Sequence, residues 1–256
     1  DETDFLKPNQ QFPSVDGKRS VQVYLSRMRE ALEDYESVTD DIELDDFVYA
    51  PFHTPFPGMV RKAALLAYRH VIRDSEYEDE LADEIGRQPR EDDFADRESY
   101  EEAIRDYMDE LKRTEQYQSW YDTVVEPTLG LSREVGNWYT SSVHLARVSA
   151  LRDALDRDAE FVDDTLLVAS YGSGAQAEIH AETIREGWRA EIEGLDIDEQ
   201  LAARYDLTWS EYEDVHDVHE YDMDVGREIE EFTQPESEFV FTGWGRMNER
   251  KYEYVE

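Results

Sequence analysis

The amino-acid sequence predicts an α/β fold on the strength of three observations. Short apolar runs at residues 46–50 and 165–169 have the length and composition of buried strands. Apolar residues at helical spacing flank the first run. The last stretch, residues 239–255, alternates well enough to form a closing hairpin. Strands and helices that follow one another in this order are typical of an α/β pattern.

The first part of the chain is predicted to lead from an irregular segment into two helices. Residues 1–17 contain two prolines and a Val-Asp-Gly turn, which disfavour regular structure. A helix is predicted over residues 18–36 and a second amphipathic helix over residues 59–73. The apolar positions that support the first helix are Val21, Tyr24, Leu25, Met28, Leu32 and Tyr35.

The middle of the chain is unusually polar. Asp, Glu and Arg dominate residues 74–115, and large aliphatic side chains are few. Such a composition predicts solvated helices. We therefore expect a peripheral helical insertion, extending to about residue 127, rather than part of the core.

The remaining elements alternate between helix and strand. A helix rich in small residues is predicted over residues 137–155, before the strand at 165–169 and a returning strand within 175–189. An acidic helix is expected over residues 208–221, with Thr208 as its N-cap.

The charge balance predicts a protein that works in concentrated salt. The chain has 64 acidic and 26 basic residues, a formal net charge of −38. Salt of molar strength shortens the screening length to about 3 Å and relieves the resulting self-repulsion. Disordered acidic proteins and nucleic-acid mimics are the other classes with such acidity. Plentiful apolar and aromatic residues disfavour disorder, including 5 Trp and 16 Tyr.

Length and composition suit one large domain or two small ones. No apolar run approaches the roughly 20 residues that span a bilayer, and no signal peptide opens the chain, so a soluble cytoplasmic protein is expected. The absence of Cys excludes a thiolate metal site and a Cys nucleophile within these residues. The first residue is Asp, which suggests a processed chain or a piece of a longer one.

A first candidate for chemistry is His53, which ends the predicted strand and precedes a proline and a helix. Open α/β sheets place their ligands at the carboxyl ends of strands. His53 therefore suits a donor that polarises a substrate carbonyl. The alternative is an imidazole that simply hydrogen-bonds a neighbouring carbonyl.

Two further candidates lie at turns. Asn137 precedes the small-residue helix, where its amide could orient a substrate or act as a plain N-cap. The glycine-rich turn 170–174 follows the buried strand. It could punctuate a hairpin, or it could aim the Ser173 N–H into a pocket as one arm of an oxyanion hole.

The sequence offers one imaginable metal site. His216 and His219 share a helix face, with Asp214, Asp217, Glu220 and Asp222 nearby. In so acidic a chain such a cluster arises easily by chance, so no metal is predicted.

Five stretches resemble, in the same order, motifs of 3-hydroxy-3-methylglutaryl-CoA (HMG-CoA) synthase, a member of the thiolase-fold superfamily. They are DFLKP (4–8), VDGKRSVQVYL (15–25), FHTPF (52–56), GNWYTSSV (136–143) and SYGSGA (170–175). The resemblance implies a thiolase-like layered α/β/α fold, of which residues 1–256 form the second half.

The resemblance also implies an activity. The family condenses an enzyme-bound acetyl group with acetoacetyl-CoA and then hydrolyses the thioester to release HMG-CoA. Free CoA is the other product, and the reaction is a step of the mevalonate pathway to isoprenoids. No cofactor is implied beyond the CoA thioesters used as substrates. The family's nucleophilic Cys and basic Glu precede the DFLKP motif, so the resemblance implies that an N-terminal half outside this chain supplies them. Homo-oligomers are expected because thiolase-fold enzymes dimerise.

Site residues are implied position by position. His53 matches the His that polarises the acetoacetyl carbonyl, and Asn137 matches an Asn that contacts the same substrate. Ser173 and Gly172 lie in the turn that holds the thioester oxygen. The remaining matches are Tyr139 in the pocket, Asp4 and Phe5 near the acyl group, and Lys62 at CoA.

The mouth of a CoA tunnel should remain basic in an acidic shell, and the expected residues are Lys18, Arg19, Arg61 and Lys62. Gly58 departs from the family, because animal members often place a CoA-contacting Lys there. A rival interpretation is a non-catalytic thiolase-like scaffold that binds acyl-CoA or a partner enzyme. A third treats residues 74–115 as an acidic interaction surface.

Overall fold

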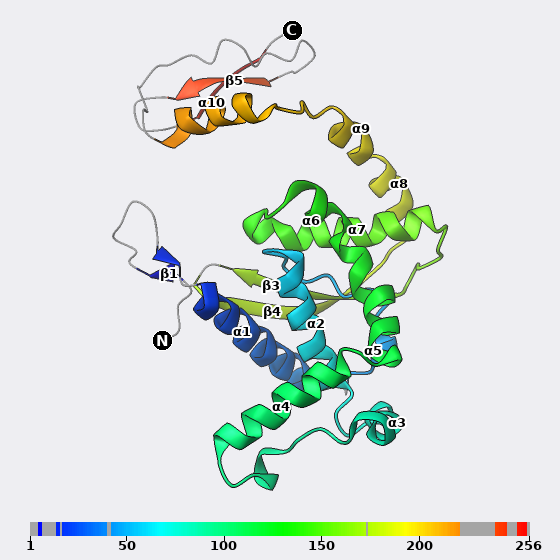
Figure 1. Ribbon diagram of the computed structural model, residues 1–256. Coiled ribbons are helices and arrows are strands. Elements are labelled where there is room, and N and C mark those ends of the chain that lie inside the picture. The colour runs from blue at the N-terminus through cyan, green and yellow to red at the C-terminus, as the bar shows by residue number, and fades with distance from the viewer. Residues whose placement is uncertain are drawn as a thin grey trace. The chain divides into compact units, whose positions relative to one another are not determined.

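The computed structural model describes residues 17–39, 42–172 and 174–220, with short strand segments at 5–6, 14–15, 239–244 and 250–254. The chain divides into two compact units, residues 1–196 and 197–256. Helices and strands of the first unit position the candidate site (Figure 1).

The two helices predicted near the start of the chain are confirmed as α1 (Gly17–Val38) and α2 (Pro57–Val71). Proline is well placed at the start of α2, because the first N–H groups of a helix have no intrahelical partner. Before α1, β1 (Phe5–Leu6) pairs antiparallel with β2 (Ser14–Val15). The prediction of an irregular N-terminal segment is therefore wrong for these four residues.

The sheet of the first unit is a long antiparallel pair. The strand β3 (Thr165–Gly172) and the strand β4 (Gln176–Thr183) pair over their full lengths, from Thr165 with Thr183 to Gly172 with Gln176. Both strands agree with the predictions for residues 165–169 and 175–189. The turn between them places Gly172 at the carboxyl end of β3.

The strand predicted over residues 46–50 forms differently. This segment runs parallel to β3 but makes two isolated bridges, from Tyr49 and from Phe52, rather than a continuous ladder. Pro51 lies between the bridges and has no N–H to donate, so the ladder is interrupted there. The second bridge nevertheless delivers the chain to His53 at the carboxyl end of β3.

β3 separates two hydrophobic cores because successive side chains of a strand point to opposite faces. Leu167 and Ala169 belong to the larger core, which contains buried residues of α1 and α2. Leu166 and Val168 belong to the smaller core. That core also contains residues of α7 (Ser142–Asp156), which lies on the other side of β3 from α1 in Figure 1.

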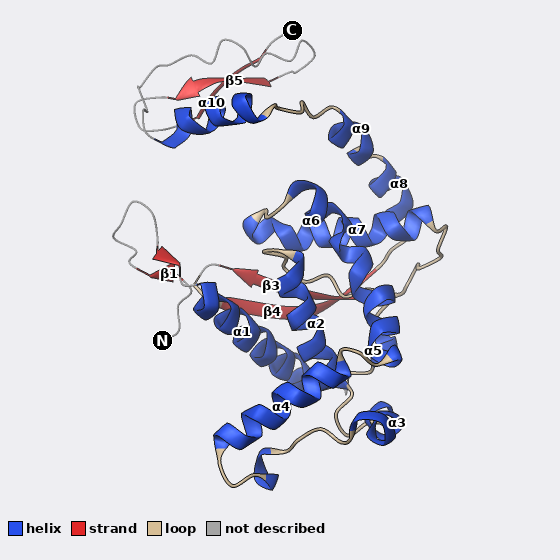
Figure 2. Cartoon of the chain, in the orientation of Figure 1, coloured by secondary structure: helices blue, strands red, loops and turns tan. Residues whose placement is uncertain are grey.

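Helices dominate the chain between α2 and α7 (Figure 2). These elements are α3 (Glu76–Ile85), η2 (Glu91–Asp93), α4 (Arg97–Leu111), α5 (Glu115–Trp120), η3 (Tyr121–Val125), η4 (Glu126–Leu129), α6 (Gly130–Val135) and η5 (Tyr139–Ser141). The helix predicted over residues 137–155 therefore begins later, at Ser142, because residues 139–141 form a separate tight turn.

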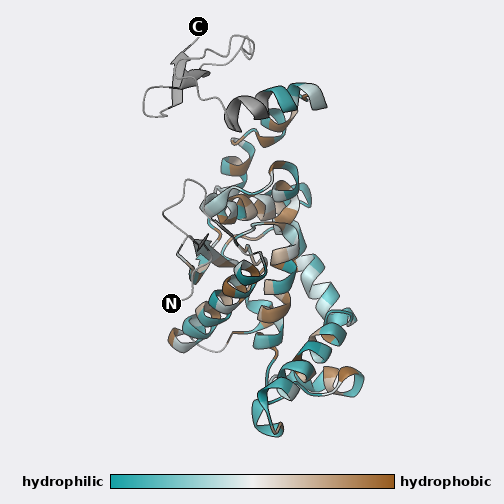
Figure 3. Ribbon diagram, turned by 60° about the vertical axis from the view of Figure 1, so that its left-hand side comes forward, coloured by the Kyte–Doolittle hydropathy of each residue, from teal (hydrophilic) through white to brown (hydrophobic). Residues whose placement is uncertain are grey.

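The prediction that residues 74–115 lie outside the core is wrong. Most of α4 is hydrophilic in Figure 3, yet its buried side chains Tyr107 and Leu111 belong to the larger core. Leu81 of α3 belongs to it as well. The acidic composition reflects the solvated faces of these helices, and a narrow apolar stripe attaches them to the rest of the unit.

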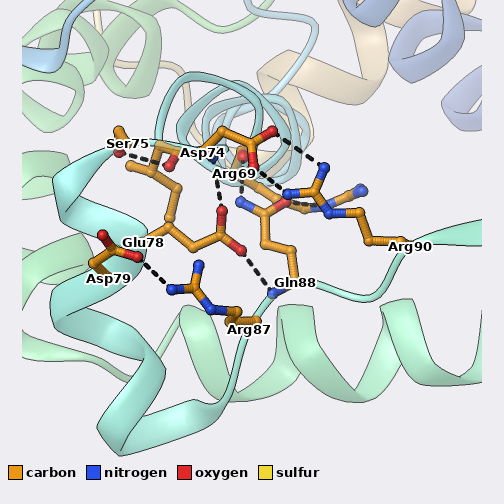
Figure 4. Close-up of polar contacts among 9 residues, drawn as sticks. Arg69, Asp74, Ser75, Glu78, Asp79, Arg87, Gln88 and Arg90 are labelled. Atoms are coloured by element: carbon orange, nitrogen blue, oxygen red, sulfur yellow. Dashed lines mark hydrogen bonds and ion pairs between the residues drawn. The ribbon is translucent and has the colours of Figure 1, made fainter. Parts of the chain in front are cut away.

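A buried carboxylate holds the insertion together (Figure 4). Glu78 is fully buried and accepts the N–H of Asp74 at 2.7 Å and the N–H of Gln88 at 2.9 Å. The Gln88 amide in turn donates to the carbonyl of Arg69 in α2 at 2.8 Å. Both ends of α3 are thereby tied to α2.

The first unit ends with the short helix α8 (Trp188–Glu193). The second unit contains α9 (Ile197–Ala202), α10 (Trp209–Glu220) and an antiparallel hairpin of β5 (Phe239–Trp244) and β6 (Arg250–Tyr254). The predicted acidic helix and closing hairpin are confirmed. Thr208 caps α10 as predicted: its hydroxyl accepts the Glu211 N–H at 3.3 Å while the Glu211 carboxylate accepts the Thr208 N–H at 2.7 Å.

Among the described helices, none is both long enough and apolar enough to cross a membrane.

Candidate active site at the carboxyl end of β3

The backbone of His53 is fixed on both sides. Its N–H donates to the carbonyl of Ala169 in β3 at 2.7 Å. Its carbonyl accepts a hydrogen bond from the Tyr24 hydroxyl of α1 at 2.8 Å. The next residue, Thr54, is held locally because its hydroxyl donates to the Phe52 carbonyl at 2.8 Å. His53 therefore has a well-defined position at the end of the strand, as its sequence context predicts.

The imidazole of His53 is attached to α7. Its Nδ1 lies 2.9 Å from the Ser142 hydroxyl, which also accepts the N–H of Thr54 at 3.0 Å. Among the described residues, no side chain or backbone group hydrogen-bonds the other ring nitrogen, Nε2. The ring thus has one anchored nitrogen and one available for a substrate.

Burial keeps this imidazole neutral. His53 is 6% exposed, and desolvation lowers its pKa from 6.5 to about 4. An imidazole with this pKa is uncharged at pH 7, and it can still donate one hydrogen bond from its protonated nitrogen. The structure therefore favours a neutral hydrogen-bond donor over a positively charged one.

Two tyrosines surround His53. Tyr24 and Tyr171 make an edge-to-face contact with ring centroids 5.1 Å apart, and their centroids lie 6.4 and 5.7 Å from that of His53. Desolvation raises the pKa of Tyr24 far above its ordinary value, so its hydroxyl remains a donor to the His53 carbonyl. Sequence reasoning assigned Tyr24 to the core by its helical spacing and did not single out Tyr171, although Tyr171 lies within the SYGSG motif.

Asn137 and Tyr139 form an exposed turn before α7. The Asn137 amide oxygen accepts the Tyr139 N–H at 2.7 Å, a contact within the turn. Asn137 is not a helix N-cap, because that position is taken by Trp138 in η5 and by Ser141 in α7. Tyr139 is 74% exposed and has a φ of 51°, a conformation that residues other than glycine rarely adopt. The structure does not bring either side chain into hydrogen-bonding contact with His53.

The glycine-rich turn meets this exposed turn. A Cβ on Gly172 would lie 3.8 Å from Cγ2 of Thr140, in ordinary contact. Gly174, on the other side of the turn, has a φ of 88°, which glycine adopts without strain. Ser173 lies outside the described residues, so its role as an oxyanion-hole donor remains a prediction.

The predicted CoA-binding cations lie on two helices. Lys18 is in the first turn of α1, and Arg61 and Lys62 are exposed in α2. Arg61 donates from Nε to the Tyr121 hydroxyl at 3.4 Å, and this hydrogen bond raises its pKa. Within the described part of the chain, no hydrogen bond or ion pair joins Arg61 or Lys62 to His53.

Gly58, in the first turn of α2, has a crowded surrounding. A Cβ there would lie 3.2 Å from Cε2 of the Phe56 ring, closer than ordinary van der Waals contact. A lysine at this position would require the ring to move.

Four further sequence candidates fall where side chains are not described. Asp4 lies outside the described residues, and for Phe5 the backbone of β1 is described but not the side chain. The side chains of His216 and His219 in α10 are likewise outside the description. Among the residues that are described, no group of three or more His, Asp or Glu could hold a metal ion.

A broad hollow of about 850 Å³ adjoins the site along β4. Its lining comes from α1, α7, β3 and β4 and includes Tyr171, Gly172 and Thr140. Basic and acidic side chains alternate in it, as in the ion pair of Arg147 with Glu182 at 2.6 Å. Gly172 is the one residue that the hollow shares with the predicted site.

The family model described as "Hydroxymethylglutaryl-coenzyme A synthase C terminal" matches residues 1–240. The chain belongs to this family. A hydroxymethylglutaryl-CoA synthase of Haloferax volcanii is 67% identical over all 256 residues, which make up 57% of that relative. Hydroxymethylglutaryl-CoA synthase B of Dictyostelium discoideum is 32% identical over 188 residues, covering 69% of this chain and 37% of that relative. The chain thus spans little more than half the length of its Haloferax relative.

Solved structures of HMG synthases have the same fold. MvaS in complex with 3-hydroxy-3-methylglutaryl coenzyme A matches 99% of this chain and 55% of its own, with a TM-score of 0.70 and 22% identity. The HMG synthase of the curacin biosynthetic pathway, in complex with holo donor-ACP, matches 98% of this chain and 54% of its own, with a TM-score of 0.68 and 23% identity. The predicted thiolase-like fold is confirmed, and the Haloferax relative agrees with the predicted salt adaptation.

Proposed function

We propose that this chain supplies the acceptor-orienting half of the active site of an HMG-CoA synthase. The complete enzyme condenses acetyl-CoA with acetoacetyl-CoA, and water then hydrolyses the thioester bond to the enzyme, so that the products are HMG-CoA and free CoA. The observation that carries the proposal is His53, a buried neutral imidazole with Nδ1 anchored on Ser142 and Nε2 available. Family membership supplies the reaction class.

The chemistry needs such a donor. When the carbanion of the acetyl group attacks the ketone carbon of acetoacetyl-CoA, a C–C bond forms and negative charge develops on the ketone oxygen. A neutral N–H that donates a hydrogen bond to that oxygen stabilises the charge. We assign this role to His53, with Asn137 as a second contact and Ser173 and Gly172 at the thioester oxygen.

The other reacting groups come from elsewhere in the complete enzyme. The chain has no Cys, so the thiolate that carries the acetyl group belongs to another part of the enzyme. The same part is proposed to contain the Glu that removes a proton from the methyl group of the bound acetyl. Asp4, Phe5 and Tyr139 are proposed to line the acyl pocket. Lys18, Arg61 and Lys62 are proposed to contact CoA, whose phosphates attract cations. We place the enzyme in the cytoplasm. We also propose that it is a homo-oligomer, which a molar mass from light scattering in concentrated salt would test.

Replacement of His53 in the full-length protein tests the proposal. The variant His53→Ala should lower kcat by about 10²–10³-fold, the usual cost of a lost oxyanion donor, and raise the KM for acetoacetyl-CoA. The matched control is His70→Ala, which removes another part-buried imidazole that pairs with Glu36 in the same unit. Steady-state kinetics of CoA release should show no comparable loss for the control.

Two outcomes would contradict the proposal. Unchanged kinetics in His53→Ala would remove His53 from the site. A full-length protein that binds acetoacetyl-CoA but forms no HMG-CoA would instead indicate the non-catalytic scaffold.

A further inference from the structure

The hydroxyl of Ser142 connects α7 to the segment that carries His53. Ser142 begins α7 and is fully buried. Its oxygen accepts the Thr54 N–H at 3.0 Å and lies 2.9 Å from His53 Nδ1. Both groups belong to the segment that follows Pro51, so the hydroxyl joins α7 to that segment at the position of the imidazole.

The direction of the hydrogen bond to the ring follows from a count of hydrogens. A serine hydroxyl has one hydrogen to donate. No described group other than His53 Nδ1 lies at hydrogen-bonding distance to accept it. If Nδ1 carried the ring proton, it would point that proton at the hydroxyl oxygen, and the buried hydroxyl hydrogen would have no acceptor. Buried polar hydrogens are rarely left in that state.

We infer that Ser142 is a positioning residue that holds His53 in the tautomer with its proton on Nε2. Ser142 donates to Nδ1, so the single proton of the neutral ring resides on the nitrogen that no described residue engages. The inference rests on the proposed function, because it assigns Nε2–H as the donor to the acceptor ketone.

The surroundings of the ring support a neutral form. The titratable groups that face it are Tyr24 from α1 and Tyr171 from β3, and Ser142 is the contact from α7. None of these side chains is a carboxylic acid, and desolvation is the cause that lowers the pKa of His53. Because no carboxylate among the described residues stabilises an imidazolium here, the tautomer of the neutral ring decides what the site can donate.

Nitrogen NMR of the full-length protein, labelled with ¹⁵N-histidine, tests the tautomer directly. The His53 signals are identified by their loss in His53→Gln. We expect a pyridine-type shift for Nδ1 and a pyrrole-type shift for Nε2 at pH 7. The opposite pattern, with the proton on Nδ1, would overturn the inference. Because this measurement does not depend on turnover, it separates failure of the inference from failure of the proposed function.

Three variants of α7 then test the role of the hydroxyl. Ser142→Ala should give a mixture of tautomers and lower kcat by about tenfold or more, less than the roughly 10²–10³-fold expected for a lost donor. Ser142→Thr keeps the hydroxyl and should restore the single tautomer and most of kcat. The matched control is Ser149→Ala: Ser149 is also buried in α7 and joins two backbone groups, the Leu131 N–H at 3.3 Å and the Pro127 carbonyl at 2.8 Å.

The control separates positioning from general stability. Ser149→Ala should leave the His53 tautomer and kcat unchanged, even where it lowers the melting temperature. If Ser142→Ala retained the pure Nε2–H spectrum, or if Ser149→Ala disturbed it equally, Ser142 would not be the residue that sets the tautomer.

Discussion

Among the described residues, Glu78 and His53 are the buried side chains of the Asp, Glu, His, Lys and Arg types, and their hydrogen bonding differs. Glu78 has both carboxylate oxygens occupied by backbone N–H groups (Figure 4). His53 has one nitrogen occupied and the other without a described partner. Since buried polar groups are normally satisfied, the incomplete one is the better candidate for chemistry. Burial alone does not distinguish a structural group from a functional one.

The largest effect on stability is expected from removing the satisfied group. In Glu78→Ala, the N–H groups of Asp74 and Gln88 lose their acceptor, and each unsatisfied buried group costs about 1–3 kcal/mol. We expect the free energy of unfolding to fall by about 2–4 kcal/mol in urea titrations, with kcat of the folded enzyme nearly unchanged. The matched control is Glu76→Ala, an exposed position in the first turn of the same helix. Equal losses in both variants would contradict the structural role of Glu78.

A somewhat smaller effect is expected from pH acting on His53. Its pKa is about 4 in the folded protein and 6.5 as a free group, so the unfolded chain binds more protons between these values. Protonation of His53 should therefore cost no stability above pH 6.5. As the pH drops from 6.5 towards 4, the free energy of unfolding should fall by roughly 2–3 kcal/mol because of this group.

The pH effect is measured as a difference between wild type and His53→Gln in concentrated salt. Salt screens the many surface carboxylates, whose own titration overlaps at low pH. The wild type should lose more stability than the variant from pH 7 to pH 5. Parallel curves would show that His53 is not desolvated as the structure indicates.

The smallest effect is expected at the surface around Glu78. Arg87 pairs with Asp79 at 2.6 Å, but both side chains are 63% exposed. Exposed pairs contribute about 0–1 kcal/mol, and less in concentrated salt. Arg87→Ala should therefore change the unfolding free energy by less than about 0.5 kcal/mol in molar salt. A loss close to that of Glu78→Ala would show that the surface ion pairs, rather than the buried carboxylate, hold α3.

The sequence predicts much of this architecture because periodicity is a local property. Helical spacing located α1, and a short apolar run located β3. The position of His53 at a strand end followed from the apolar run before it and the proline after it. These features depend on neighbours in the chain and need no knowledge of the tertiary structure.

What the sequence did not predict depends on contacts between distant residues. Ser142 lies 89 positions from His53, and its role was hidden within a run of small residues. The core positions of Tyr107 and Leu111 were hidden by the acidic residues around them. Single apolar side chains in a polar helix leave little signal in composition, although they decide where the helix attaches.

His53 is hydrogen-bonded to three elements, α1, α7 and β3, and this has a consequence for how the protein folds. Its carbonyl depends on Tyr24, 29 positions away, its ring on Ser142, 89 positions away, and its N–H on β3 still further along the chain. Contacts between such distant segments form slowly because large loops must close first. We therefore expect the hydrogen-bonded position of the imidazole to be among the last features to form, so that its NMR signal would report when helices have packed on both faces of the sheet.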